Sequence, residues 1–349
     1  MKNKKVFYIN LIYYLCILIV AFIFALGYFK VIKSEFLTSA LIQGLVMLGI
    51  PTLMYSLFVS KSIKKTFVDF GFKKISLTIL LCSVGLGFTL FFINGYVADI
   101  FYTILTFLGY DSSIGLAMSV GSDFFKDMLL TALIPGICEE VLHRGMYLRG
   151  CAKQGYTRYG LIFSSILFGL THLNIQQFFY ASIIGLLMGI IVIITDSILP
   201  SIIIHIMNNG LSIYFAYGAA YNWPVANLKA ILENAILSLG FVPAVIMLCA
   251  IIALLIYLYR LLLVIIIKDK QKLTAQQLAK DLNMQDMSYN EINDKLNEVE
   301  QILQQSSTPS SLNIKDTNTK LKYADNVFLY SSIALGILVT VSSFIWGIL

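Results

Sequence analysis

Long apolar stretches, separated by short polar segments, recur along the whole chain. Each stretch is about 20 residues long, which is enough for a helix to cross the hydrocarbon core of a bilayer. The predicted spans cover roughly residues 7–29, 37–60, 75–96, 126–148, 159–175, 177–195, 198–218, 240–267 and 327–347. The pattern predicts an all-α, polytopic transmembrane helix bundle with about eight or nine spans.

Basic residues gather at the ends of these spans. The loop 61–74 carries five lysines against the single acid Asp69. Because basic loops stay on the cytoplasmic side of a membrane, this loop and the N-terminus are both predicted to be cytoplasmic. The first apolar stretch is longer than a signal-peptide core, so we expect it to be a retained span. Counting the predicted spans onward from this loop places Arg149 and Arg260 on the cytoplasmic side as well.

Three segments do not fit a simple span. Residues 97–125 predict an outward-facing loop or a re-entrant segment, and residues 224–239 predict an amphipathic interfacial segment. Residues 268–325 are polar and precede the last span. Within them apolar residues repeat at heptad spacing over 289–303, which is typical of a short amphipathic helix. This segment is either a mobile cytoplasmic linker or a docking element for a protein partner.

The chain therefore divides into five predicted regions. They are N-terminal transmembrane helices with an outer loop (1–125), a helical core that carries the chemistry (126–218), an interfacial segment with a transmembrane helix (219–267), a polar cytoplasmic linker with a short amphipathic helix (268–325) and a C-terminal transmembrane helix (326–349).

Composition supports a multi-pass protein of a cell membrane. The mean hydropathy is +0.82 and only 13% of residues are charged, against about 25% in soluble proteins. The net charge of +6 lies at span ends, which argues against a nucleic-acid partner. The five cysteines are scattered and show no C-x-x-C spacing, so neither disulfides nor a cysteine zinc site is predicted. Lysine outnumbers arginine by 21 to 4, which is typical of an AT-rich bacterial genome.

Ionisable residues cluster in one apolar window. All three histidines lie there, at His143, His172 and His205, together with the adjacent pair Glu139 and Glu140. Each ionisable side chain inside a bilayer costs about 2.5–3.5 kcal/mol on insertion scales, so such a cluster indicates a functional site. Glutamate and histidine together point to proton transfer or metal binding. The window predicts an intramembrane enzyme.

Helical spacing divides the two glutamates into separate roles. Glu140 and Arg144 are four residues apart and can form an ion pair on one face of a helix. Glu139 points about 100° away and is left to act as a general base. The alternative is that the two acids and Arg144 only tie helices together. His143 is placed to contact either acid.

The other polar candidates lie on the following helices. His172 ends one apolar segment, and His205 lies within another with Asn209 four residues later on the same face. Asn208 is an alternative to Asn209. Gly185 and Gly189 form a small-xxx-small pattern that allows helices to approach closely. This packing would bring the His172 and His205 helices together.

Three motifs in this order resemble the CPBP family of intramembrane proteases, which includes the type II CAAX prenyl proteases and the Abi bacteriocin-processing and immunity proteins. The motifs are Glu139-Glu140-x-x-x-Arg144, Phe168-x-x-x-His172 and His205-x-x-x-Asn209, and the match covers about 126–215.

The resemblance implies hydrolysis of a peptide bond. Glu139 would activate water and His172 would orient that water or carry its proton. His205 and Asn209 would stabilise the oxyanion. Family members have been described both as zinc metalloproteases and as metal-independent glutamate proteases. Zn²⁺ held by Glu139, His172 and His205 and a metal-free mechanism therefore stay equally open.

Two positions depart from the family pattern. The residue before Arg144 is usually aromatic, and here it is His143. It would be a further metal ligand, a charged neighbour of Glu139, or a replacement for an aromatic filler. Asp196 stands where a glycine is common, and we expect it at a cytoplasmic turn.

We expect an endopeptidase whose substrate is a membrane-associated peptide or protein. A bacterial source favours a peptide precursor over a prenylated CAAX protein. One alternative is an ion or proton transporter that uses the Glu and His residues as a relay, although no internal repeat supports it. Another is a non-catalytic immunity or partner membrane protein.

Overall fold

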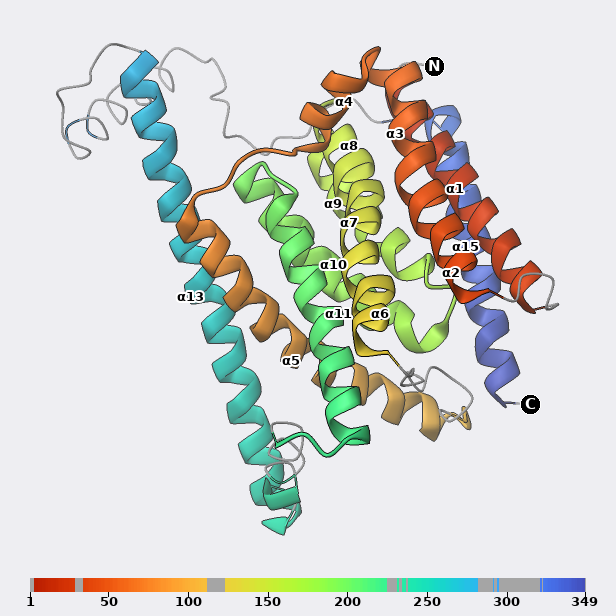
Figure 1. The fold of residues 1–349 in the computed structure, drawn as a ribbon, viewed down its shortest axis with the longest axis vertical. Helices are drawn as coiled ribbons and strands as arrows, with labels where there is room; N and C mark the ends of the chain where they lie inside the picture. The colour runs from red at the N-terminus through yellow and green to blue at the C-terminus, as the bar shows by residue number, and fades with distance from the viewer. Residues whose placement is uncertain are drawn as a thin grey trace.

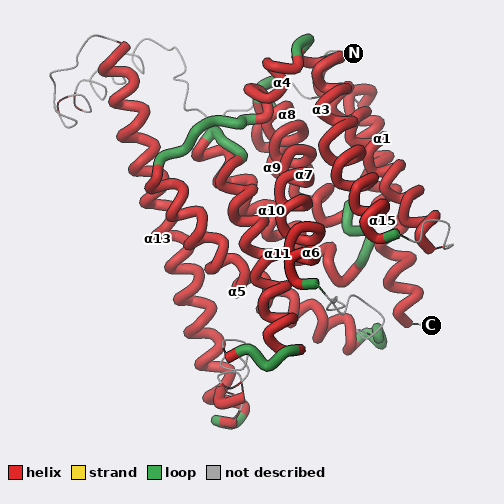
Figure 2. Tube along the Cα trace, in the orientation of Figure 1, coloured by secondary structure: helices red, strands yellow, loops and turns green. Residues whose placement is uncertain are grey.

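The structure is a computed structural model that describes residues 3–28, 34–111, 123–224, 231, 234–236, 238–281, 291, 294, 321 and 323–348. Every regular element within these ranges is a helix, which confirms the all-α prediction for them (Figure 2). Along the chain the helices, with π-helical segments written η, are α1 (Lys4–Tyr28), α2 (Glu35–Ser39), η1 (Ala40–Gly49), α3 (Ile50–Tyr55), η2 (Ser56–Ser60), α4 (Ile63–Phe70), α5 (Leu77–Phe107), α6 (Phe124–Asp127), η4 (Met128–Leu133), α7 (Ile134–Glu140), η5 (Val141–Arg149), α8 (Gly150–Ala152), α9 (Thr157–Leu170), α10 (Ile175–Thr195), α11 (Leu199–Ala220), α13 (Phe241–Asp281) and α15 (Tyr323–Ile348).

Six helices in the described ranges are long and apolar enough to cross a membrane. They are Lys4–Leu26, Phe36–Ser60, Leu77–Phe107, Ile175–Thr195, Phe241–Thr274 and Asp325–Ile345. Six of the nine predicted spans therefore coincide with helices of suitable length and composition. The other three expected spans also form helices, but two of them carry the polar residues of the Glu and His window, and α9 has only 14 residues.

Two helices extend beyond the spans predicted for them. The segment 97–125 was expected to be an outward-facing loop or a re-entrant segment, but α5 continues through residues 97–107 and ends just before Gly109, which has a φ of +87°. No glycine or proline interrupts those residues, so nothing stops the helix earlier. Similarly, α13 continues into the polar segment as far as Asp281. Of the predicted amphipathic helix at 289–303 only residues 291 and 294 are described, and much of the interfacial segment at 224–239 also lies outside the described residues.

The helical run from Phe124 to Ala152 carries the two glutamates and alternates between α- and π-helical turns. Proline lacks the backbone N–H that an α-helix needs and its ring crowds the preceding turn. Pro135 lies two residues after the end of η4, and Pro51 lies two residues after the end of η1. The widened π-helical turns thus accommodate both prolines, and such turns are frequent at functional sites.

The first and last helices pack against each other along the bundle. The C-terminal helix α15 lies beside α1 (Figure 1). Asn10 on α1 is fully buried and donates from Nδ2 to the backbone oxygen of Asp325 at 2.9 Å. Tyr147 donates to Asn10 Oδ1 at 2.9 Å. A buried hydrogen-bond network therefore joins the first and last helices to the helix that carries the glutamates.

One end of the bundle is held together by ion pairs between segments that the sequence predicts to be cytoplasmic. Arg149 donates from Nε to the backbone oxygen of Asp69 at 3.0 Å, and Lys153 pairs with the Asp69 carboxylate at 3.0 Å. Asp196, at the turn between α10 and α11, pairs with both Lys73 and Arg149. These segments therefore lie on one side, as the charge count requires.

Asp196 has a left-handed backbone conformation, with φ +53° and ψ +29°. Glycine adopts this conformation without strain, and aspartate tolerates it better than most other residues. Partial burial by itself would raise the pKa of the Asp196 carboxyl, but the hydrogen bond from Lys73 and the positive charge of Arg149 hold that pKa below its ordinary value. At this turn two ion pairs of Asp196 therefore take the place of the conformational freedom that a glycine would give.

Candidate active site

Glu140 and Arg144 form the ion pair that the sequence predicts. Arg144 Nη1 donates to Glu140 Oε1 at 2.9 Å, and both side chains are 0% exposed. Arg144 also donates from Nη2 to the backbone oxygen of Gly185 on α10 at 3.0 Å. Its guanidinium lies 4.4 Å from the centre of the Phe168 ring on α9, a cation–π distance. The pair thus connects three helices from a fully buried position.

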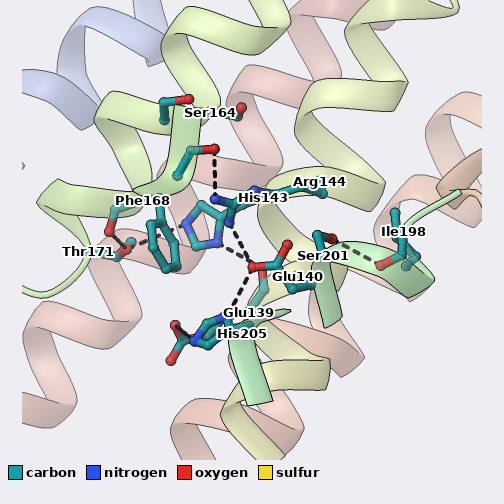
Figure 3. Close-up of polar contacts among 12 residues, drawn as sticks. Glu139, Glu140, His143, Arg144, Ser164, Phe168, Thr171, Ile198, Ser201 and His205 are labelled. Atoms are coloured by element: carbon teal, nitrogen blue, oxygen red, sulfur yellow. Dashed lines mark hydrogen bonds and ion pairs between the residues drawn. The ribbon is translucent and has the colours of Figure 1, made fainter. Parts of the chain in front are cut away.

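Glu140 also binds His205 on α11. His205 Nδ1 lies 2.9 Å from Glu140 Oε1, and Figure 3 shows Glu140 between Arg144 and His205. A carboxylate oxygen only accepts hydrogen bonds, so the hydrogen is on Nδ1. The opposite ring nitrogen, Nε2, faces Glu139, with 3.9 Å to Oε2. Glu140 therefore fixes the orientation of His205 rather than facing open space.

Glu139 lies on a different face of the same helix and has a different environment. Its side chain is 16% exposed. Gln43 on η1 donates from Nε2 to Glu139 Oε1 at 2.8 Å. No lysine or arginine pairs with Glu139 among the residues that the structure describes. Its carboxylate is thus held by one amide and is not neutralised by a fixed positive charge.

Two cavities meet at Glu139. The larger has a volume of about 490 Å³ and the smaller of about 410 Å³. Four residues line both of them, namely Gln43, Glu139, His172 and Gln177. The larger cavity is also lined by His205, Asn208 and Asn209. The structure therefore brings the predicted base, two of the histidines and the asparagines to the lining of these cavities.

His172 lies in the turn between α9 and α10. Its Nδ1 is 2.8 Å from the backbone oxygen of Phe168, and because a carbonyl only accepts, Nδ1 donates this bond. Nε2 is then the ring nitrogen that can exchange a proton with a molecule in the cavities. The next residue, Leu173, has a φ of +53°, an uncommon conformation for a bulky side chain. The chain thus turns sharply just after this histidine.

Phe168 is the packing centre of the site. Its ring makes edge contacts with all three imidazoles, with centroid separations of 5.0 Å to His143, 5.2 Å to His172 and 5.6 Å to His205. It also lies under the guanidinium of Arg144. A single aromatic ring therefore fixes the spacing of the histidines.

His143 lies behind this ring and lines neither cavity. It is 0% exposed. Nδ1 is 2.8 Å from the backbone oxygen of Glu139, and Nε2 is 3.1 Å from the Tyr13 hydroxyl and 3.4 Å from Thr171 Oγ1. Both ring nitrogens already have partners, and the ring packs between aromatic side chains. This placement fits the filler interpretation and gives no support to a ligand role.

The two asparagines of α11 are linked to each other. Asn208 donates from Nδ2 to Asn209 Oδ1 at 3.1 Å, and Asn209 donates from Nδ2 to the backbone oxygen of Thr131 at 3.0 Å. A side-chain amide has two hydrogens on its nitrogen, so Asn209 keeps one for a molecule in the larger cavity. These bonds hold Asn209 in a fixed orientation.

The sequence left open a zinc site formed by Glu139, His172 and His205. Within the described ranges no group of three or more His, Cys, Asp or Glu side chains could hold a metal ion. Two of the candidate ligands, Glu139 and His205, face each other, and the bond from His205 Nδ1 to Glu140 leaves His205 Nε2 as the nitrogen that could bind a metal.

Sequence reasoning missed four residues of the site, namely Tyr13, Gln43, Thr171 and Gln177. Gln43 and Gln177 are polar positions inside predicted spans, and this was the available signal. Gly185 was predicted only as a packing residue, but a Cβ there would lie 3.1 Å from Arg144 Nη2 and from Phe168 Cδ1. Its lack of a side chain is therefore what lets Arg144 reach the α10 backbone.

The comparisons with known proteins agree with the resemblance seen in the motifs. A family model described as "Type II CAAX prenyl endopeptidase Rce1-like" matches residues 121–211. The chain carries an Rce1-like domain. No curated protein and no solved structure matches the chain significantly. The Rce1-like domain contains every residue of the three motifs, whereas Tyr13 and Gln43 come from helices outside it.

Proposed function

We propose that the protein is an intramembrane endopeptidase in which Glu139 activates a water molecule. The observation that carries this proposal is the asymmetry of the two glutamates. Glu140 is fully buried and paired with Arg144, whereas Glu139 lines both cavities, accepts a hydrogen bond from Gln43 and pairs with no lysine or arginine among the described residues. The match to a prenyl endopeptidase family supports the same reaction class.

In the proposed reaction Glu139 takes a proton from water as the water oxygen bonds to the substrate carbonyl carbon. The carbonyl oxygen becomes an oxyanion. The C–N bond then breaks, and the proton passes to the leaving amine from Glu139 or through His172 Nε2. His172 is suited to this because its Nδ1 hydrogen is committed to the backbone, so its second nitrogen alone exchanges protons.

The oxyanion would form in the larger cavity. Asn209 offers its second amide hydrogen there. His205 can donate from Nε2 only when its ring carries both protons, because its first hydrogen points at Glu140. A donor placed at an oxyanion contributes about 2.7–4 kcal/mol to the stabilisation of the transition state. Asn209 and protonated His205 together would supply this stabilisation.

The substrate we propose is a membrane-associated peptide or protein in an extended conformation. The two cavities share four lining residues, Glu139 among them, and so offer room for chain on both sides of the bond that is cut. A bacterial peptide precursor fits the composition of the chain better than a prenylated protein.

The test is a comparison of the peptides released by membranes that contain the wild-type protein or Glu139→Gln. Glu291→Gln is the matched control, since Glu291 is exposed and lines neither cavity. We expect a set of released peptides that is lost in Glu139→Gln and kept in the control. Equal peptide sets in the three samples would reject the protease proposal, and a change in ion flux alone would favour the transporter alternative.

The metal question needs a separate measurement. Elemental analysis of purified active protein, together with activity after chelator treatment, decides between a zinc enzyme and a glutamate protease. We propose the metal-free route, in which active protein contains no stoichiometric zinc and resists chelators. One zinc per chain, with loss of activity on its removal, would reject that route.

A further inference from the structure

Gln43 is the one residue outside the Rce1-like domain that touches the predicted base through a hydrogen bond in the described structure. It lies on the π-helical segment η1 and is 9% exposed. It is also one of the four residues that line both cavities. A chain that passes Glu139 on either side therefore passes Gln43.

The bond to Glu139 fixes the orientation of the Gln43 amide. Only the NH₂ group can donate to a carboxylate, so Nε2 faces Glu139 and Oε1 must point away from it. Oε1 has no hydrogen-bond partner among the described residues. A buried amide oxygen without a donor costs about 1–3 kcal/mol. The resting site therefore contains an acceptor whose bonding is incomplete.

A peptide substrate brings donors of the required kind, because every non-proline residue has a backbone N–H. Gln43 lines both cavities, but Oε1 itself is shielded in the present arrangement, so accepting a substrate N–H requires the amide to rotate while Nε2 keeps its bond to Glu139. The same amide can then hold the base and the substrate at once, and this would place the scissile carbonyl next to Glu139.

We propose that Gln43 is a substrate-positioning residue, with Nε2 bound to Glu139 and Oε1 accepting a backbone N–H that flanks the scissile bond. This inference rests on the proposed endopeptidase function. It assigns part of the substrate site to the second predicted span, outside the matched family domain. The contact is made to the backbone, so it selects an extended chain and not a particular side chain.

The probe is a palmitoylated, internally quenched apolar peptide that wild-type protein cleaves and Glu139→Gln does not. A matched series replaces one backbone N–H at a time by an ester oxygen, at positions beside the scissile bond but not at it. With wild-type protein, we expect the ester at one position to raise KM about fivefold, the value of one hydrogen bond. In Gln43→Met, ester and amide at that position should give the same KM.

Two further variants complete the design. Gln154→Met is the matched control, because Gln154 lies in the turn after α8 and lines neither cavity; it should keep the wild-type ratio of ester to amide KM. Gln43→Asn keeps an amide but shortens it by one methylene, and it should reduce the ratio. If Gln43→Met does not fold in a thermal unfolding assay of the full chain, Gln43→Asn carries the comparison.

The outcomes separate the two proposals. Glu139-dependent cleavage with an unchanged ester-to-amide ratio in the Gln43 variants would overturn the inference and leave the protease proposal standing. A lower kcat on ester and amide alike, with no position-specific effect, would also overturn it, because Gln43 would then act on Glu139 alone. If no peptide shows Glu139-dependent cleavage by folded wild-type protein, both proposals fail together.

Discussion

The buried pair of Glu140 and Arg144 allows a quantitative prediction. Both side chains are 0% exposed and 2.9 Å apart. Removing one partner leaves the other as an unpaired buried charge, which costs about 3–5 kcal/mol. We therefore expect Glu140→Gln and Arg144→Met each to lower the free energy of unfolding by this amount. Arg144→Met additionally loses the hydrogen bond to Gly185, worth about 1 kcal/mol.

The double variant, which carries both changes, should be much less unstable than the sum of the single variants. No buried charge is left unpaired, so the remaining costs are the lost hydrogen bond to Gly185 and a weaker bond from His205 to a neutral amide oxygen, about 1–3 kcal/mol in total. The single changes together amount to roughly 7–11 kcal/mol. The predicted coupling energy is therefore at least about 4 kcal/mol.

The assay is equilibrium unfolding of the four proteins in mixed detergent micelles, followed by the fluorescence of the tryptophans. A double-mutant cycle gives the coupling directly. Costs of the two single changes that simply add in the double variant would refute the reasoning, because they would show that the two charges do not compensate each other in the folded protein.

Three further predictions concern the close packing at Gly185, the turn at Asp196 and the role of His143. Gly185→Ala should lower the free energy of unfolding by about 1–3 kcal/mol, since its Cβ would lie 3.1 Å from Arg144 Nη2 in a fully packed site. Gly189→Ala should cost less, because its nearest neighbour is the movable end of a leucine side chain. The reverse order of stabilities in thermal unfolding would contradict this account. Asp196→Asn should be less stable than wild type by a constant amount above about pH 4, and the difference should shrink as the pH falls further. The reason is that a carboxyl whose pKa is lowered on folding stabilises the fold only while it is ionised. A stability difference that grows in acid would count against the ion pairs. His143→Phe should keep proteolysis within a few-fold of wild type and leave the metal content unchanged, because the ring lies outside both cavities; a complete loss of activity in a folded variant would show that the imidazole has a chemical role.

The different environments of the two glutamates could be predicted from the sequence alone. An α-helix turns by about 100° per residue, so adjacent side chains cannot face the same neighbour. A basic residue four positions after Glu140 then decides which acid is paired. This local geometry survives tertiary folding, and the structure places Glu140 on Arg144 and Glu139 at the cavities.

The helix ends were less well determined by the sequence. Apolar length predicted where spans exist but not where α5 and α13 stop. Both continue into more polar residues that contain no glycine or proline to break them. Hydropathy reports burial in lipid, whereas helix termination depends on backbone conformation, and the two need not coincide.

Only the tertiary structure decided which residues from other helices complete the site. Gln43 lies 96 positions before Glu139 and Tyr13 lies 130 positions before His143. Nothing in the local pattern of either span indicates its partner, because the contacts depend on how whole helices pack. The sequence by itself thus predicted the candidate reacting groups, which share one helix or a regular spacing. Packing determined which polar side chain bonds Glu139, which histidine lies outside both cavities, and where the two cavities meet.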